Sequence, residues 1–202
     1  MLTKIDDLHR PDHFYLDQDD ECYFIGDYTA GKGYAHSSTN QLIYNLKKTV
    51  DRRGRLEYWH KEQAIRTAAG ALSQFLNPAF IKAGTFVPIP PSKAKDDPMY
   101  DDRMSQIICL LGPEVDLREA VEQIESTAVV HLSNLRPGPD ALHGNYRIVD
   151  AFREPTPTTI AIVDDVLTTG AHFKAMKRIL AETYPGVNIC GIFLARRVPG
   201  TE

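Results

Sequence analysis

The stretch IAIVDDVLTTGAH, residues 160–172, decides the fold. A run of apolar and β-branched residues, typical of a buried strand, is followed directly by two carboxylates, two threonines and a glycine, and then by a pattern that predicts a helix. A helix that begins after Thr168, Thr169 and Gly170 presents free backbone N–H groups and the positive end of its dipole. Because glycine permits close approach of the backbone to a ligand, this turn is suited to hold a phosphate.

The two acidic residues of the stretch, Asp164 and Asp165, need a different partner. Carboxylates beside a bound phosphate repel it unless they face hydroxyl groups or a metal ion. A sugar phosphate meets both conditions, with its phosphate in the turn and its ribose hydroxyls on the carboxylates. The alternative is an acidic turn with a threonine cap and no ligand, which requires all these features to coincide.

Strands and helices alternate along the chain. The expected strands are residues 21–28, 85–90, 127–132, 158–163 and 187–197, and the expected helices are residues 40–48, 59–76, 102–112, 117–126 and 171–184. Residues 91–102 are expected to form a polar loop, and residues 134–147, rich in glycine and proline, a mobile connection or cover. The alternation predicts an α/β fold with a mainly parallel twisted sheet flanked by helices, where ligands bind beyond the carboxyl ends of the strands. We expect residues 1–20 to be a polar lead-in and residues 21–202 to form a single domain.

The composition limits the partners and the cellular context. A formal net charge of −4 gives no general reason to expect nucleic acid as a partner. The cysteines Cys22, Cys109 and Cys190 are far apart and odd in number, which favours reduced thiols over disulfides or a zinc ribbon. No segment approaches the roughly 18 apolar residues of a membrane span, and residues 1–21 lack the apolar core of a signal peptide. We therefore expect a cytoplasmic protein without a membrane partner.

The nine residues VDDVLTTGA, 163–171, resemble the phosphoribosyl pyrophosphate (PRPP) loop of the type I phosphoribosyltransferases at each position. The order of four other segments is similar to the ComF-like branch of that family: LIYNLKK (42–48), VPIPPSK (87–93), DRMSQ (102–106) and HLSNLRPGPDALHGNYRIVDAF (131–152). The resemblance implies a type I phosphoribosyltransferase-like fold with a small hood or cover region. It also implies an enzyme that transfers a phosphoribosyl group to or from a nitrogenous base, with release or uptake of pyrophosphate.

Carried over by position, the resemblance assigns roles to the residues of the site. Contacts to the 2- and 3-hydroxyls of the ribose are implied for Asp164 and Asp165, and contacts to the 5-phosphate for Thr168, Thr169, Gly170 and Ala171. The pyrophosphate-binding loop, where the family often carries an unusual peptide bond, corresponds to Pro88–Lys93, which includes Pro90, Pro91, Ser92 and Lys93. The implied catalytic residues are Lys93, Arg103, Asp164 and Asp165, with Lys95 as a further candidate cation.

Mg²⁺ is the implied cofactor, because it stabilises the charge that develops on the leaving pyrophosphate together with lysine or arginine. From the protein, only Asp164 and Asp165 are candidates to contact the ion, through water. The expected ligand is PRPP or a ribose 5-phosphate derivative, and the acceptor is an unidentified nitrogenous base. The cover at residues 134–147 is suited to exclude water, and a homodimer would be in keeping with the family.

Three departures from the ComF-like pattern keep a second interpretation open. The amino-terminal cysteine pairs of that branch are missing, the helix start Arg103-Met-Ser-Gln lacks the usual glycine, and His172 stands where threonine is more usual. His172 either assists phosphate binding or simply forms part of the first helical turn. The aromatic residues Tyr100, Tyr146 and Phe152 either stack on a nucleobase or belong to the core. The alternative function is a non-catalytic PRPP- or nucleotide-sensing or accessory protein of a DNA-uptake or stress pathway.

Overall fold

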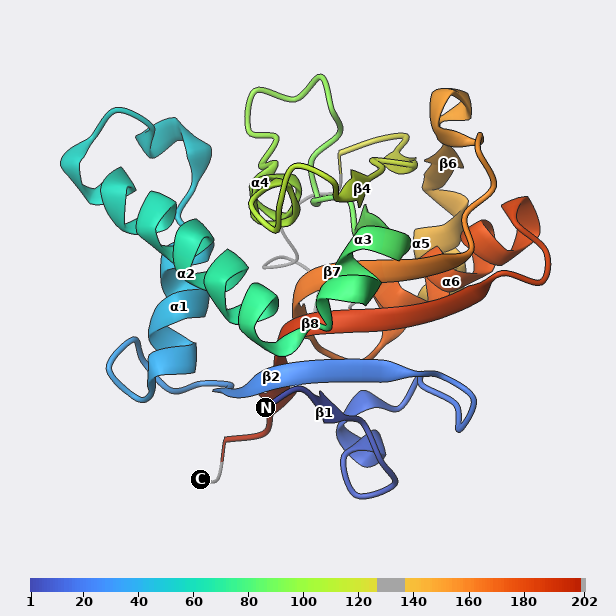
Figure 1. The fold of residues 1–202 in the computed structure, drawn as a ribbon. Coiled ribbons are helices and arrows are strands. Elements are labelled where there is room, and N and C mark those ends of the chain that lie inside the picture. Colours follow the sequence, from blue (N-terminus) through green and yellow to red (C-terminus); the bar gives the residue numbers. More distant parts are fainter. Residues whose placement is uncertain (127–136, 201–202) are drawn as a thin grey trace.

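A six-stranded sheet forms the centre of the computed structural model, which describes residues 1–126 and 137–200 (Figure 1). Its strands are β1 (Thr3–Lys4), β2 (Cys22–Thr29), β3 (Thr85–Pro88), β4 (Asp116–Leu117), β7 (Thr159–Leu167) and β8 (Asn188–Val198). A separate antiparallel pair consists of β5 (Val121–Gln123) and β6 (Tyr146–Ile148). The helices are α1 (Ser38–Leu46), α2 (Trp59–Phe75), α3 (Pro78–Ala83), α4 (Arg103–Cys109), α5 (Pro139–Gly144) and α6 (Ala171–Thr183), with 3-10 turns η1 (Arg10–His13), η2 (Val50–Arg52), η3 (Leu56–Tyr58) and η4 (Asp150–Phe152).

The sheet has the strand order β1-β2-β8-β7-β3-β4. Only β1 pairs antiparallel to its neighbour β2, and the other neighbouring strands pair in parallel. The prediction of an α/β fold with a mainly parallel sheet flanked by helices is therefore confirmed. Pro88 at the end of β3 pairs with Val163 of β7, so the segment after β3 and the acidic residues of β7 begin at the same level of the sheet.

Helices cover both faces of the sheet, because side chains alternate in direction along each strand. In β7, Ala161 and Val163 belong to the cluster formed with α1, α2 and α4, whereas Ile160 and Ile162 belong to the cluster formed with α6. The result is a three-layer arrangement in which every central strand is apolar on both faces, as expected for buried parallel strands.

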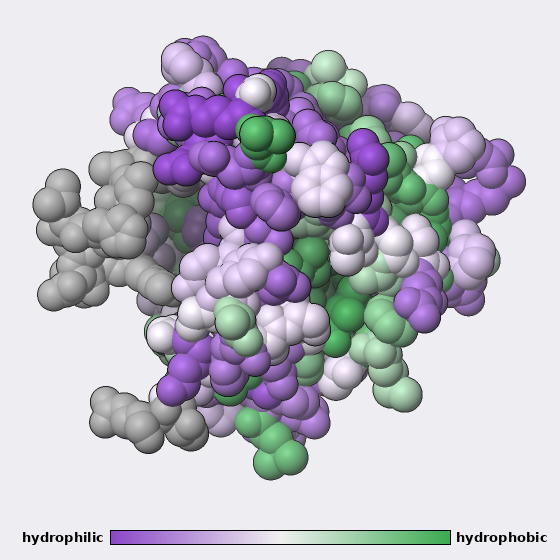
Figure 2. Space-filling view, turned by 90° about the vertical axis from the view of Figure 1, so that its left-hand side faces the viewer, coloured by the Kyte–Doolittle hydropathy of each residue, from purple (hydrophilic) through white to green (hydrophobic). Residues whose placement is uncertain are grey.

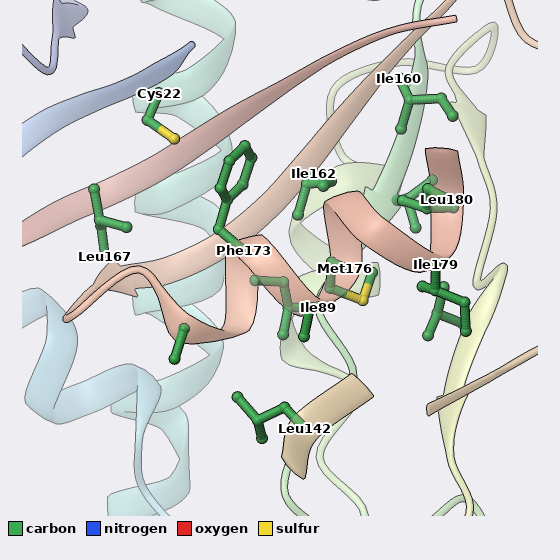
Figure 3. Close-up of a cluster of buried hydrophobic side chains, with 14 of the residues drawn as sticks. Cys22, Ile89, Leu142, Ile160, Ile162, Leu167, Phe173, Met176, Ile179 and Leu180 are labelled. Carbon is green, nitrogen blue, oxygen red and sulfur yellow. The ribbon is translucent and has the colours of Figure 1, made fainter. Parts of the chain in front are cut away.

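The helix α6 shows how the apolar spacing of the sequence is used. Phe173, Met176 and Leu180 recur every three or four residues and are fully buried, and Figure 3 shows them in the same cluster as Ile160 and Ile162 of β7. Each such buried side chain stabilises the fold by roughly 1.5–3 kcal/mol. This packing fixes the first turn of α6 against the end of β7, where the sequence places the phosphate-binding turn.

The prediction of a helix at residues 117–126 is wrong. These residues contain the end of β4 and the whole of β5, because Leu117 pairs with Phe86 of β3 and Val121 pairs with Ile148 of β6. The apolar residues are spaced as in a helix, but tertiary strand pairing outweighs this weak local preference. The expected strand at residues 127–132 lies outside the described residues.

The region expected to be a cover, residues 134–147, is described from residue 137 onward. It contains α5, which packs against α6, and Tyr146, the first residue of β6. The pair β5 and β6 with α5 lies beside the main sheet in Figure 1, so this region has regular structure where the sequence predicts a connection.

The first twenty residues, expected to be a polar lead-in, pack against the sheet and α6. Ile5, His13, Leu16 and Asp20 are buried. The carboxylate of Asp20 pairs with two lysine ammonium groups of α6, at 2.8 Å from Lys174 and 2.6 Å from Lys177. This segment is therefore packed against the domain through specific contacts, although its composition is hydrophilic.

Candidate functional site

The connections of the central strands reverse direction within the sheet. The chain leaves β3 toward β4 on one side of the sheet, and it leaves β7 through α6 toward β8 on the other side. In parallel sheets, ligands bind at such a reversal, outside the carboxyl ends of the two strands. This point lies between Pro88 and the acidic residues of β7. Figure 2 shows the side of the molecule toward which β7 and β8 run, and hydrophilic side chains cover most of it.

A cavity of about 430 Å³ occupies this position. Its lining combines the segment after β3, the end of β7, the first turn of α6 and side chains of α1, α4 and α5. The lining residues are Lys47, Ile89, Pro90, Pro91, Ser92, Asp101, Arg103, Met104, Pro137, Leu142, Asp164, Asp165, Val166, Thr168, Thr169, Ala171 and His172.

The acidic pair lies inside β7, which continues four residues beyond the predicted end because it pairs with β8 as far as Leu167. Asp165 is almost completely buried, with 3% of its surface exposed. The carboxylate of Asp164 accepts a hydrogen bond of 2.7 Å from the backbone N–H of Asp165. Both acids line the cavity.

The turn between β7 and α6 is shaped by Gly170. Its φ of 89° lies in the left-handed region that favours glycine, and it forms the N-cap of α6. A Cβ atom at this position would lie 2.8 Å from the side chain of Leu16. The N-terminal segment also holds the two preceding carbonyl groups: the ring of His13 donates from Nδ1 to the oxygen of Thr168, and the N–H of Tyr15 donates to the oxygen of Thr169 over 3.0 Å.

Two cations share the buried carboxylate of Asp165. Arg103 donates to Oδ2 from Nη2 and Nε, at 2.7 and 3.2 Å, and the ammonium of Lys47 lies 3.5 Å from Oδ1. Burial alone would raise the pKa of Asp165, but Lys47 and Arg103 outweigh it and hold the pKa below its ordinary range. Burial raises the pKa of Asp164 from the ordinary 3.8 to about 7, and the negative charge of Asp165 adds to this shift.

A buried lysine that the sequence analysis missed connects these groups. Lys61 in α2 is 1% exposed and donates to Asp101 over 2.5 Å and to the carbonyls of Leu46 and Lys48 over 2.8 and 2.7 Å. Asp101 also accepts from Nη1 of Arg103 over 2.8 Å. A signal existed in the sequence, because Lys61 falls on the same helical stripe as the apolar residues of α2.

The implied pyrophosphate loop is only partly in the cavity. Pro90, Pro91 and Ser92 line it, whereas the lining does not include Lys93, whose ammonium lies 3.6 Å from Asp97. Lys95 pairs with Glu119 over 2.6 Å. Among the described residues the one cis peptide bond joins Glu154 and Pro155, so the bonds of Pro88–Lys93 are trans and the unusual peptide bond of the family is not seen there.

The aromatic candidates have structural contacts. Tyr146 is buried, and its hydroxyl lies 2.8 Å from Nδ1 of His172 at the edge of the cavity. Phe152 packs against the core on the α6 side of the sheet. Tyr100 lies in the loop before α4, and burial raises its pKa to about 12. Of the three, Tyr146 is connected to the cavity by a hydrogen bond.

Comparisons with known proteins do not add a family to this description. No protein-family model matches the chain, and no curated protein matches it. Within residues 1–126 and 137–200, no helix combines the length and the apolar character needed to cross a membrane. The site must therefore be interpreted from its own geometry.

Proposed function

We propose that this protein binds PRPP, or a related ribose 5-phosphate derivative, and transfers the phosphoribosyl group to or from a nitrogenous base. One observation carries the proposal: at the reversal point of the sheet, two carboxylates and the N-terminal turn of a 13-residue helix line the same cavity. Carboxylates suit ribose hydroxyls, and the first turn of a helix suits a phosphate. The resemblance of residues 163–171 to the PRPP loop supports the same assignment.

The reaction requires no nucleophile from the protein. The bond between C1 of the ribose and the pyrophosphate oxygen breaks with its electron pair on pyrophosphate, and a bond forms between C1 and a nitrogen of the base. Positive charge develops on the sugar, and negative charge on the leaving group. In this proposal the ionised Asp165, together with Asp164 once its carboxyl has lost its proton, stabilises the positive charge of the sugar, and the first turn of α6 orients the sugar through the 5-phosphate.

The residues of the site suit Mg²⁺ only when the ion binds together with the phosphate groups of a ligand. In the described part of the chain, no group of three or more histidine, cysteine or acidic side chains is arranged to hold a metal, and both oxygens of Asp165 already face cations. Mg²⁺ commonly binds through one or two carboxylates together with substrate phosphates. When bound, it would neutralise charge on the pyrophosphate, and Asp164 is the carboxylate best placed to hold it.

A second candidate function is binding of PRPP without transfer. It is favoured by the engagement of Arg103, which donates to Asp101 and Asp165, and by the position of Lys93 outside the cavity lining. Both functions fit a cytoplasmic location, which we propose because the three cysteines are free. Release of pyrophosphate in the presence of a base separates the two functions.

Calorimetric titration with PRPP and Mg²⁺ tests the proposal. We expect the native protein to bind and Asp164→Asn/Asp165→Asn to bind at least about 100-fold more weakly, because two hydrogen-bonding carboxylates are each worth roughly 1.5–3 kcal/mol. The matched control is Asp140→Asn/Asp150→Asn, two acids whose side chains are 95% and 85% exposed. Thermal unfolding of both variants checks that each is folded. Equal affinity of the native protein and the site variant would contradict the assignment of the carboxylates.

The raised pKa of Asp164 predicts a pH-dependent affinity. Below its pKa of about 7 the carboxyl is protonated, so binding of PRPP with Mg²⁺ must release a proton and weakens about tenfold per pH unit. Between about pH 4 and 7 the folded protein holds a proton that the unfolded chain has lost, so this group also makes stability fall as pH rises through that window. Titrations at pH 6.5 in buffers of different ionisation enthalpy measure the proton release. In Asp164→Asn the protons released by this carboxyl should be lost, so that only the titration of the ligand remains. Unchanged proton release would show that Asp164 is not the group that loses a proton on binding.

A further inference from the structure

Lys47 differs from the other cation of the cavity in its freedom to meet a ligand. It stands at the C-cap of α1 and lines the cavity with its side chain 48% exposed. The side chain of Arg103 is 17% exposed and donates to two carboxylates. Among the described lysines and arginines of the lining, Lys47 is therefore the one whose charged group is open to a bound molecule.

The contact between Lys47 and Asp165 is loose. Its 3.5 Å separation exceeds the 2.7–2.9 Å typical of a charge-assisted hydrogen bond, whereas Arg103 reaches the same carboxylate at 2.7 Å. When the ammonium of Lys47 turns to another anion, Asp165 keeps both hydrogen bonds from Arg103. The exchange therefore leaves no buried charge without a partner.

The backbone that carries Lys47 is held in place from behind. Lys61 donates to the carbonyls of Leu46 and Lys48, the residues on either side, and its ammonium is buried. These two hydrogen bonds fix the end of α1 without involving the side chain of Lys47. Lys61 is thus a positioning residue, and it does not line the cavity itself.

The residue of β7 that Lys47 faces determines which part of the ligand this lysine contacts. A strand rises about 3.3 Å per residue, so Asp165 lies roughly 10 Å before Thr168, where the phosphate-binding turn begins. Lys47 contacts the Asp165 end, beside the sugar and away from the 5-phosphate. The lining around it contains three carboxylates, Asp101, Asp164 and Asp165, so a diphosphate on C1 needs a mobile cation there.

We infer that Lys47 is the side chain that binds the diphosphate group of the ligand, exchanging its contact with Asp165 for the diphosphate oxygens. This inference rests on the proposed function and names a residue that the resemblance did not assign. It predicts that Lys47 acts on ligands that carry a diphosphate at C1 and not on those that carry only the 5-phosphate.

The test compares PRPP with ribose 5-phosphate, each titrated with Mg²⁺ into the native protein, Lys47→Ala and Lys47→Arg. We expect Lys47→Ala to weaken PRPP binding by about 10- to 100-fold and ribose 5-phosphate binding by less than about 2-fold, with partial retention in Lys47→Arg. The control is Lys48→Ala, because the neighbouring lysine pairs with Asn45 and does not line the cavity. It should bind both ligands as the native protein does.

Each outcome decides between the claims. If Lys47→Ala binds PRPP normally, or loses both ligands equally while remaining folded by thermal unfolding, Lys47 does not bind the diphosphate and the inference is overturned. If the native protein binds neither ligand, the proposed function itself fails, and the inference fails with it. Because ribose 5-phosphate reports on the rest of the site, these two failures are distinguishable.

Discussion

Replacing Gly170 by valine is expected to abolish PRPP binding and to lower the free energy of unfolding by about 3 kcal/mol. Two effects add: a left-handed backbone is strained by roughly 1–2 kcal/mol for a residue with a Cβ, and overpacking adds roughly 1–3 kcal/mol. The second effect arises because the new Cβ would lie 2.8 Å from Leu16. Denaturant unfolding and calorimetric titration with PRPP measure the two losses.

Gly186 provides the matched control for this substitution. It has a similar φ of 81°, but a Cβ there meets nothing within 4 Å, so Gly186→Val should show only the backbone strain and should bind PRPP normally. The contact with Leu16 is isolated by a double-mutant cycle of Gly170→Ala and Leu16→Ala, in which we expect the double variant to be less destabilised than the sum of the single variants. If the two changes in unfolding free energy simply add, a Cβ at position 170 does not clash with Leu16.

Lys61→Met is the substitution with the next largest expected effect, a loss of about 3 kcal/mol of unfolding free energy. Methionine fills a similar volume but leaves the carbonyls of Leu46 and Lys48 without their donor and removes one cation from Asp101. Removing one partner of a buried ion pair typically costs about 3–5 kcal/mol, and we expect the lower end because Asp101 keeps Arg103. Thermal and urea unfolding provide the measurement.

The control for Lys61 is Lys82→Met. Lys82 pairs with Glu114 on the surface, where both side chains are about 70% exposed, so its removal should change stability by less than about 1 kcal/mol. A variant that combines Lys61→Met with Asp101→Asn should recover part of the lost unfolding free energy. The side chain at position 101 is then uncharged, so it no longer needs the ammonium of Lys61 as a partner. A small loss in Lys61→Met, comparable to that of Lys82→Met, would show that the buried ammonium does not organise this region.

The unit from β7 to α6 was predictable because its determinants are local. The apolar run, the acids, Gly170 and the helical spacing of Phe173 and Met176 stand next to each other in the sequence, and each acts on its immediate neighbours. The same applies to the start of α1, where the side chain of Ser37 accepts a hydrogen bond of 3.0 Å from the N–H of Asn40. Local chemistry therefore predicted the strand, the turn and the helix that bring both acids and this turn to the cavity.

The rest of the candidate site depends on contacts between distant segments. Nothing in the residues around Lys47 indicates that it meets Asp165, because that contact follows from the packing of α1 on the sheet. Residues 117–126 have apolar spacing that fits a helix, yet strand partners elsewhere in the chain decide their structure. In the N-terminal segment, the buried Asp20 is indistinguishable in sequence from its exposed neighbour Asp19 until α6 supplies the two lysines.

The distance along the chain between segments that pack together has a consequence for biosynthesis. His13 is translated 155 residues before Thr168, whose carbonyl it contacts, and Leu16 likewise precedes Gly170, so the turn between β7 and α6 is supported by a segment distant in the chain. The strand β2 likewise cannot pair until its parallel partner β8 has been translated. Such long-range pairing slows folding and postpones it until both partners have been translated. A nascent chain of this protein therefore completes the turn between β7 and α6 only after both segments have left the ribosome, and a chain that stops before Thr168 lacks this turn.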